Sequence, residues 1–344
     1  HSVFLMIVLN NFNNAPLIFN INNSEKAKLK ISILIPARNE EKNIGVLLES
    51  LMKQSFPIHE IIVLDDHSTD KTNQVLFYYK KKIENLKIIK GNELPHGWLG
   101  KNWACHQLSK EADGEYLIFL DADVELSEHA ISNAVKKMIN RKFSMLSVFP
   151  SQKIGSIGEY LVVPLMNWLL LTFLSLRKVY KSKNARFTAA NGQFILINKK
   201  SYDGISGHKA VKNEVVEDMV LGKLLKKNNE NIITCLGDEA VKCRMYEGFE
   251  DSVNGFSKNF YRGFNLPKPI FTVFITVLLL LFLAPLILAF NNMMFVLILL
   301  MIAFERIFVS VLSKQNWMIN LLLHPIQMCV MFYVGIKSAF AREI

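Results

Sequence analysis

Apolar residues follow one pattern in the first two thirds of the chain and another in the last third. From Lys30 onward, short apolar runs alternate with stretches in which apolar residues recur every three or four positions. The short runs are typical of buried strands, and the spaced residues of amphipathic helices. Strands are therefore predicted at 31–35, 60–64, 86–90, 115–120 and 143–149. Helices are predicted at 41–53, from about residue 70, and at 101–112.

The alternation of strands and helices predicts an α/β fold with a mainly parallel sheet covered on both faces. After residue 184 the alternation changes, and further strands are predicted at 187–197, 232–235 and 240–245, around a helix at 215–227. Ligands of such sheets bind beyond the carboxyl ends of the strands. Functional side chains are therefore expected in the loops that follow the strands.

The last third of the chain holds apolar runs long enough to cross a membrane. A hydrocarbon core about 30 Å thick takes roughly 20 helical residues. Residues 270–290 are uncharged, and 293–312 are uncharged except for Glu305 and Arg306. The weaker run 317–340 contains His324-Pro325, which would break it into a re-entrant helix if it does not span. At least two membrane helices are predicted.

These patterns predict three regions. Residues 1–29 form an N-terminal apolar segment, interpreted as the remnant of a membrane helix. Residues 30–266 form the α/β domain, and residues 267–344 form the membrane helices. Within the domain, the apolar stretch 160–176 is expected to be an interfacial helix, because basic residues follow it directly. The alternative is a core helix with a solvated basic end.

The formal net charge of +10 indicates an anionic partner, either nucleic acid or lipid. Nucleic acid is disfavoured, because no basic stripe is interleaved with aromatic residues. The predicted membrane helices favour lipid, and the basic residues after position 176 place the α/β domain on the cytoplasmic face. A multi-pass protein of the cell membrane is therefore expected.

Three acidic loops follow predicted strands at the edge where ligands bind. Pro36-Ala37-Arg38-Asn39-Glu40 follows the first strand, Asp65-Asp66 the second and Asp121-Ala122-Asp123 the fourth. Two carboxylates one residue apart can hold a hard divalent cation that is shared with phosphate oxygens. Taken singly, each loop is equally well explained by the preference of Asp and Glu for turns and helix starts.

Two further segments carry charged groups suited to anion binding and proton transfer. Lys101 stands at a predicted helix N-terminus, where its charge and the backbone N–H groups both favour an anion. Glu217-Asp218 supplies another pair of carboxylates. The alternatives are a solvated lysine and an exposed helix turn.

These loops, in this order, resemble the family 2 glycosyltransferases of the GT-A fold over residues 30–265. The resemblance implies a Rossmann-like sheet that binds a nucleotide-sugar, with Asp121 and Asp123 holding its diphosphate through Mn²⁺ or Mg²⁺. His67 stands where the family often has glycine, so a different local turn is expected. The residues implied in donor binding are Pro36, Ala37, Arg38, Glu40, Asp65, Asp66, Lys101, Asp121 and Arg244.

The resemblance also implies the catalytic and acceptor-side residues. Asp218 matches the family's general base, which takes the proton from an acceptor hydroxyl, and Glu217 would position it. Residues expected on the acceptor side are Asn191, Gly192 and Gln193. The segments 244–246 and 255–259 are similar to those of carotenoid- and hopanoid-associated members. The Gln-x-x-Arg-Trp motif of processive synthases is replaced by Asn-Phe-Tyr-Arg-Gly at 259–263, which argues against chain elongation.

The expected activity is an inverting transfer of a single sugar from a nucleotide-sugar, expected to be UDP-glucose, to a membrane lipid. The expected acceptor is a carotenoid carboxylate of the diaponeurosporenoate type. A carboxylate needs no deprotonation at neutral pH, so a base at Asp218 suits a hydroxyl acceptor better. A glycolipid or polysaccharide synthase acting on a hydroxyl is one alternative. A nucleotide-binding membrane scaffold without turnover is the other.

Overall fold

The computed structural model describes residues 1–18, 29–264 and 266–340 and divides the chain into two compact units. The sheet unit comprises Pro16–Ser151 and Lys178–Cys243, and the helical unit comprises His1–Ala15, Gln152–Arg177 and Arg244–Ile344. Each unit therefore combines segments that are far apart in the sequence. Of the N-terminal segment 1–29, residues 19–28 lie outside the described residues.

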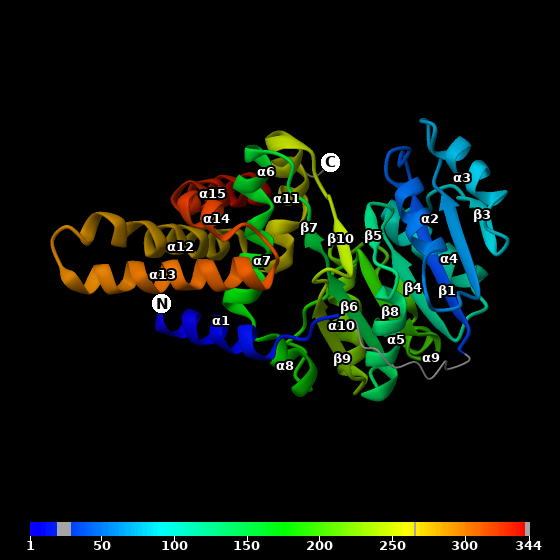
Figure 1. Cartoon of the computed structure of the whole chain (residues 1–344), viewed down its shortest axis with the longest axis horizontal. Coiled ribbons are helices and arrows are strands. Elements are labelled where there is room, and N and C mark those ends of the chain that lie inside the picture. The colour runs from blue at the N-terminus through cyan, green and yellow to red at the C-terminus, as the bar shows by residue number, and fades with distance from the viewer. Residues whose placement is uncertain (19–28, 265, 341–344) are drawn as a thin grey trace. The chain divides into compact units, whose positions relative to one another are not determined.

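A seven-stranded sheet forms the centre of the sheet unit, in the order β3-β2-β1-β4-β8-β6-β9 (Figure 1). Its strands are β1 Ile31–Ala37, β2 Glu60–Asp65, β3 Leu86–Lys90, β4 Tyr116–Leu120, β6 Met145–Phe149, β8 Phe194–Asn198 and β9 Ile232–Leu236. Strands β1 to β4 pair in parallel, β6 pairs in parallel with β9, and β8 runs antiparallel between β4 and β6. The prediction of a mainly parallel sheet is confirmed. A second, three-stranded sheet contains β5 Val124–Leu126, β10 Val241–Cys243 and β7 Ser151–Gln152.

Helices cover both faces of the large sheet. Alternate residues of β1, such as Ile33 and Ile35, join one buried apolar cluster with residues of α2, α3 and α5. Helix α4 packs against β1 and β2 and contributes nothing to that cluster, so it covers the opposite face. Burial on both faces explains why the strands are nearly continuous apolar runs. The helices of this unit are α2 Ile44–Met52, α3 Thr72–Lys80, α4 Gly100–Glu111, α5 Ala130–Asn140, α9 Lys199–Gly204, the 3₁₀ helix Gly207–Val211 and α10 Glu217–Lys227.

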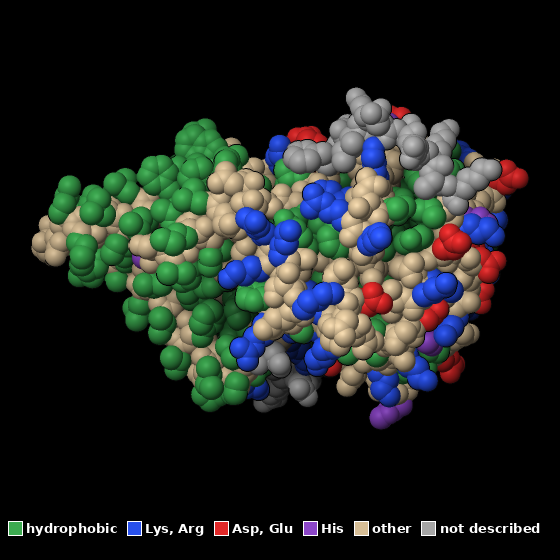
Figure 2. All heavy atoms as spheres, turned by 90° about the horizontal axis from the view of Figure 1, so that it is seen from below, with side chains coloured by type: hydrophobic (Ala, Val, Ile, Leu, Met, Phe, Trp, Pro, Cys, Tyr) green, Lys and Arg blue, Asp and Glu red, His purple; other side chains and the backbone are tan. Residues whose placement is uncertain are grey.

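The helical unit contains α1 Ser2–Asn14, α6 Ile157–Val162, α7 Pro164–Phe173, α11 Gly248–Phe264, α12 Lys268–Leu288, α13 Met293–Leu312, α14 Trp317–Leu322 and α15 His324–Phe340. Among the described residues, α12 and α13 are the two helices long and apolar enough to cross a membrane, with mean hydropathies of 2.9 and 2.5. Figure 2 shows hydrophobic side chains gathered over the surface of this unit, and Val273, Ile287, Phe290 and Met293 are among those exposed. These features favour membrane association.

Three predicted elements differ from the observed ones. The strand predicted at 187–197 begins only at Phe194, because the preceding residues form a buried loop held by hydrogen bonds to other elements. The stretch 160–176 is divided among α6, α7 and α8 Leu176–Lys181, with Pro164 in the first turn of α7. The run 317–340 is broken at Leu323, between α14 and α15, directly before the His324-Pro325 pair that begins α15.

Candidate functional site

The loops that follow β1 and β2 are joined by hydrogen bonds between backbone N–H groups and side chains. Asn39 N–H donates to Oγ of Ser68 at 3.0 Å, and Thr69 N–H donates to Oδ1 of Asn39 at 2.8 Å. Glu40 N–H donates to Oγ1 of Thr72 at 2.7 Å. These bonds satisfy polar groups near the starts of α2 and α3 and fix the two loops as one rigid edge.

The adjacent residues Asp65 and Asp66 have different surroundings. Asp65 is buried, and its two oxygens accept hydrogen bonds from Ser68 N–H at 3.0 Å and from Nδ2 of Asn73 at 3.1 Å. Asp66 remains partly exposed, and its Oδ2 lies 3.9 Å from Nη1 of Arg38. Asp65 therefore organises the turn, while Asp66 retains acceptor capacity for a ligand.

His67 has a left-handed backbone, with φ at 58°. The turn expected for glycine is thus adopted by histidine, at some cost in backbone energy. The expectation that this turn differs from the family's stays a prediction. The His67 ring lies close to Asp66, with Nδ1 at 3.3 Å from Oδ1.

A pocket of about 600 Å³ opens at the carboxyl ends of β2 and β3. Its lining combines carboxylate, hydroxyl, amide and aromatic groups, the mixture that suits a polar planar ligand. The lining residues are Asp65, His67, Ser68, Asn73, Phe77, Lys80, Ile88, Ile89 and Lys90.

Lys101, at the start of α4, is paired with the first aspartate after β4. Its Nζ lies 2.7 Å from Oδ1 of Asp121 and 3.7 Å from Oε1 of Glu217. Burial alone would lower the pKa of Lys101, but the two carboxylates outweigh burial and raise it. Lys101 is therefore a permanent cation that joins the Asp121 loop to the start of α10.

Asp123 is held through one of its two carboxylate oxygens. Its Oδ2 accepts from the thiol of Cys243 at 3.1 Å and faces Nε2 of Gln193 at 3.5 Å. Its Oδ1 is buried and has no hydrogen-bond partner among the described residues. Burial and the neighbouring charge of Asp121 raise the pKa of Asp123 to about 6. A buried carboxylate oxygen without a donor is costly, and an added cation would satisfy it.

Glu217 and Asp218 begin α10 and meet the loop that contains Gly192. Asp218 accepts hydrogen bonds from Gly192 N–H at 2.8 Å and from Met219 N–H at 2.7 Å. A Cβ at Gly192 would lie only 3.2 Å from Glu217 Oε1 and from Lys101 Nζ, so glycine leaves room for both groups. Burial raises the pKa of both carboxyl groups. A raised pKa makes a carboxylate a better proton acceptor near neutral pH.

The predicted acceptor-side residues lie in the same unit but are largely enclosed. Asn191 is buried, exchanges hydrogen bonds with Ser147 through its backbone, and accepts from Gln193 N–H through its side chain. Gln193 is buried and donates to Sγ of Cys243 at 2.8 Å. Both side chains therefore support the loop and Asp123, whereas Gly192 is the half-buried member of the three.

The other predicted donor-binding residues are divided between the two units. Pro36 and Ala37 close β1, and Arg38 is well exposed beyond it. Glu40 accepts from Nδ2 of Asn43, while burial and the charges of Asp121 and Asp70 raise the pKa of Glu40. Arg244 belongs to the helical unit, where Nη2 donates to Oε1 of Glu159 at 3.1 Å.

Asp121 and Asp123 suit a hard divalent cation, because both are carboxylates and one buried oxygen lacks a partner. Among the described residues there is no cluster of three or more His, Cys, Asp or Glu side chains placed to hold a metal ion. The two aspartates therefore fit a cation whose remaining ligands come from a bound diphosphate and water, rather than one held by protein alone.

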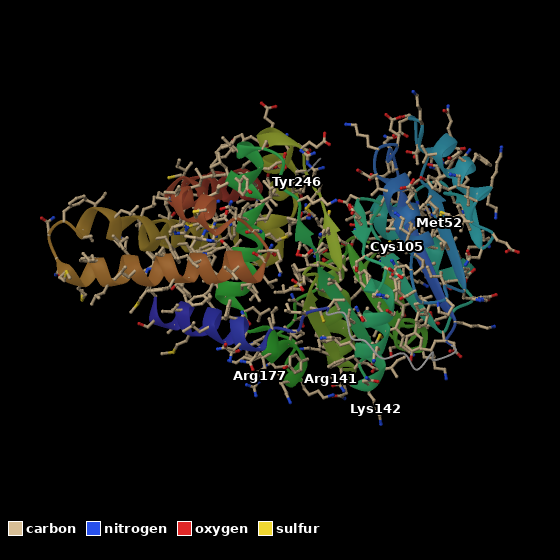
Figure 3. The ribbon with its side chains drawn as sticks, in the orientation of Figure 1. Met52, Cys105, Arg141, Lys142, Arg177 and Tyr246 are labelled. Atoms are coloured by element: carbon tan, nitrogen blue, oxygen red, sulfur yellow. The ribbon has the colours of Figure 1, made fainter. Side chains whose placement is uncertain are left out.

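Two buried cysteines, Cys105 and Cys243, lie near the candidate site residues and differ in their contacts. Cys105 on α4 (Figure 3) is buried, and burial raises the pKa of its thiol, which excludes it as a ready nucleophile. Cys243 was not singled out from the sequence, yet it contacts Asp123 directly. The two residues are 120 positions apart, so no local pattern links them.

The part of the chain that matches a known protein family contains most of the strands and loops described above. The description "Glycosyl transferase family 2" matches residues 32–203, which include the loops after β1, β2 and β4. The chain is 31% identical over 242 residues to the 4,4'-diaponeurosporenoate glycosyltransferase of Staphylococcus haemolyticus, covering 70% of this chain and 63% of that protein. It is also 31% identical over 267 residues to the enzyme of that name from Staphylococcus aureus strain USA300, covering 74% and 68%.

A solved structure shares the fold over nearly the whole chain. The mannosyltransferase PcManGT from Pyrobaculum calidifontis, determined in complex with GDP-Man and Mn²⁺, is similar with a TM-score of 0.63 and 14% identity, covering 99% of this chain and 96% of that one. This likeness and the seven-stranded sheet confirm the predicted GT-A fold. From the family match, the identity to curated relatives and the loops described above, the chain belongs to glycosyltransferase family 2.

Proposed function

We propose that the protein is a membrane-associated, inverting glycosyltransferase that moves one sugar from a nucleotide-sugar, UDP-glucose, to the carboxylate of a carotenoid-like lipid acid. The observation that carries this proposal is the meeting of Lys101, Asp121, Asp123, Glu217 and Asp218 at one edge of the sheet. The relatives at 31% identity, which are named 4,4'-diaponeurosporenoate glycosyltransferases, support a diaponeurosporenoate-like acceptor. The chain spans 63% and 68% of the length of these two relatives.

The nucleoside is assigned to the edge formed by the β1 and β2 loops. Asp66 and the exposed Arg38 offer an acceptor and donors there, and the pocket beside β3 has room for a base or ribose. Asp65 supports this edge from beneath through its bonds to Ser68 and Asn73.

The diphosphate is assigned to Lys101, Asp121 and Asp123. Lys101 offers its permanent charge beside the N-terminus of α4, where backbone N–H groups favour an anion. Asp121 and Asp123 would hold Mn²⁺ or Mg²⁺, which when bound neutralises charge on the departing diphosphate. PcManGT, which shares the fold, was determined with Mn²⁺ bound.

The acceptor oxygen attacks the anomeric carbon from the side opposite the diphosphate, which inverts its configuration. A lipid carboxylate attacks without losing a proton. For a hydroxyl acceptor, Asp218 is proposed as the base that takes the proton, with Gly192 N–H and Met219 N–H fixing its carboxylate and Glu217 holding Lys101 beside it. Such a base contributes about 10²- to 10⁴-fold in rate when the acceptor is a hydroxyl.

The raised pKa of Asp218 favours a second candidate function, a glycolipid synthase that acts on a lipid hydroxyl. Comparing a lipid acid with its matched lipid alcohol separates the two functions. If the acid is the acceptor, Asp218→Asn retains much of its activity, because a carboxylate carries no proton to remove. If the alcohol is the acceptor, Asp218→Asn loses turnover at any concentration of donor.

We further propose a multi-pass topology with α12 and α13 crossing the membrane and the sheet unit on the cytoplasmic face. The mean hydropathies of the two helices and the exposed apolar side chains on them support the spans. Lys268 at the start of α12 and the basic residues that directly follow the apolar stretch 160–176, including Lys178 and Lys181, support the orientation.

The test uses the purified full chain in lipid nanodiscs, with UDP release and lipid mass spectrometry as readouts. UDP release is expected only when UDP-glucose, the lipid acid and Mn²⁺ or Mg²⁺ are all present. Asp123→Ala is expected to lose the metal-dependent turnover, while Asp113→Ala, at an exposed position beside β4, is the matched control. Unchanged turnover in Asp123→Ala would overturn the metal assignment, and UDP binding without sugar transfer would favour a scaffold.

A further inference from the structure

The helical unit encloses polar side chains that the proposed sugar transfer does not use. Arg306 on α13, Trp168 and Thr172 on α7, and His324 at the start of α15 are each at most 4% exposed. A buried polar group normally finds a hydrogen-bond partner, because leaving one unpaired costs free energy.

Each of these four side chains has at least one polar atom without a partner among the described residues. The unpartnered atoms are Nη1 of Arg306, Nε1 of Trp168, Oγ1 of Thr172 and both ring nitrogens of His324. The remaining guanidinium nitrogens of Arg306 donate to Oε1 of Gln327 and to the carbonyl of Asn320. Nε and Nη2 of Arg306 are thus hydrogen-bonded, whereas Nη1 has no partner among the described residues.

The four side chains lie together. Cζ of Arg306 is 6.0 Å from the centre of the Trp168 ring, and the rings of Trp168 and His324 are 6.1 Å apart. Thr172 follows Trp168 by one helical turn and is buried on the same face of α7. We call Trp168, Thr172, Arg306 and His324 the donor cluster.

The donor cluster carries a positive charge without a matching negative one. Among the described residues, no carboxylate lies within 4.0 Å of Arg306, and the carboxylate of the adjacent Glu305 instead lies 3.7 Å from Nδ1 of His1. Arginine and the indole N–H only donate, and the hydroxyl and imidazole each have a proton to give. A buried cation beside unsatisfied donors is stabilised by an anion that accepts several hydrogen bonds.

We propose that the donor cluster binds the acidic head group of a lipid, a carboxylate or a phosphate monoester, inside the helical unit. An apolar crevice of about 350 Å³ between α12 and α13, lined by Leu281, Pro285 and Ile298 among others, would receive the chain. His1 also lines this crevice, and its ring lies 4.8 Å from that of Phe282, which in turn packs against both Trp168 and His324 at 5.0 and 5.6 Å. The inference rests on the proposed membrane association but not on the proposed sugar transfer.

The experiment measures lipid binding in the absence of any sugar donor. Full-length protein in neutral phosphatidylcholine nanodiscs is photolabelled with a palmitic acid that carries a diazirine, and with its methyl ester. The acid is expected to half-saturate labelling at a concentration about tenfold or more below the ester, since hydrogen bonds to charged groups are strong. Labelled peptides are expected to map to α12 and α13. Dodecyl phosphate is expected to compete, and inorganic phosphate is not.

Three variants test the donor cluster itself. Arg306→Gln is expected to weaken labelling by the acid about tenfold and to leave labelling by the ester unchanged. Thr172→Val keeps the side-chain shape and removes only the hydroxyl donor, and Trp168→Phe keeps an aromatic ring and removes the indole N–H, so they test the cluster even where Arg306→Gln does not fold. Ser313→Ala is the matched control, because Ser313 is buried at the C-terminal cap of α13 and its hydroxyl donates to carbonyls of that helix.

Equal labelling by acid and ester would overturn the proposal. So would unchanged acid labelling in Trp168→Phe and Thr172→Val. Competition by inorganic phosphate as strong as that by dodecyl phosphate would indicate a site for a free anion and would also overturn it. Because no sugar is transferred in this assay, failure of the proposed glycosyltransfer leaves its outcome unaffected.

Discussion

Nζ of Lys101 lies 2.7 Å from Oδ1 of Asp121, which joins the start of α4 to the loop after β4. This ion pair places a permanent positive charge beside the two aspartates to which the donor diphosphate is assigned. The neighbouring carboxylate of Glu217 keeps Lys101 charged and directed toward the same point.

Replacing Lys101 with methionine is expected to weaken UDP binding about 10- to 100-fold, which corresponds to losing a charged hydrogen bond to phosphate. Isothermal titration calorimetry with UDP and Mn²⁺ measures the effect. Lys110→Met is the control, because Lys110 is exposed in the last turn of the same helix. Equal UDP affinity in the two variants would contradict a role for Lys101 in diphosphate binding.

Gly192→Ala is expected to lower turnover about 10- to 100-fold without unfolding the protein. The added methyl group would lie 3.2 Å from both Glu217 Oε1 and Lys101 Nζ and would displace these groups slightly. Gly204→Ala is the control, because a Cβ there meets nothing within 4 Å. Steady-state kinetics and thermal melting separate loss of activity from loss of fold, and wild-type turnover in Gly192→Ala would refute the close packing.

His67→Val and His67→Gly are expected to differ in stability by about 1–2 kcal/mol, with the glycine variant more stable. The φ of 58° at this position is easily adopted by glycine and strained for a β-branched residue. Denaturant unfolding of both variants provides the measurement. If the two unfold at the same denaturant concentration, the left-handed turn is absent in solution.

The helical unit is expected to become less stable at acidic pH, because Glu159 then gains a proton. Burial alone would raise the pKa of Glu159, but hydrogen bonds from Gly155 N–H, Gly248 N–H and Arg244 lower it to about 2 from its usual 4.5. Between these values the unfolded state binds more protons than the folded state, so the contribution of Glu159 is present above pH 4.5 and is lost as pH falls toward 2.

Thermal melting of wild type and Glu159→Gln between neutral and acidic pH tests this linkage. The variant is expected to be less stable than wild type at neutral pH and to approach it as the pH falls. Glu239→Gln, at an exposed position, is the control and is expected to follow the wild-type pH dependence. A constant difference between wild type and Glu159→Gln at every pH would show that the charge is not responsible.

Most of the fold was predictable from local patterns. The strands at Leu86–Lys90 and Ile232–Leu236 were placed to within a residue, because both stand out as short runs between turn-forming or polar residues. The strand expected from residue 187 failed, because Phe187, Ala189 and Ala190 extend the apolar positions of the strand into the buried loop before Phe194. Its buried backbone is satisfied by Ser147 and Asp218 rather than by a neighbouring strand.

The sequence predicted which residues belong to the candidate site better than it predicted the role of each residue. Asp65 and Asp66 look alike in sequence, but only the contacts with Ser68 and Asn73 show that both oxygens of Asp65 already accept a hydrogen bond within the protein. Arg244 was assigned to the donor by resemblance, whereas in the structure its guanidinium bonds to Glu159. The assignment of Arg244 to donor binding stays a prediction, and a structure with the nucleotide-sugar bound would test it.

The sequence by itself determined the α/β architecture, the family and the two long apolar helices, because these depend on the spacing of apolar residues and on short motifs after strands. Only the tertiary structure decided which carboxylates are saturated and which are free, and it alone brought Cys243 to Asp123 and Arg306 to Trp168. The reason is physical: periodicity and motifs act over a few residues, whereas hydrogen-bond satisfaction and charge pairing depend on residues that meet only after the chain has folded.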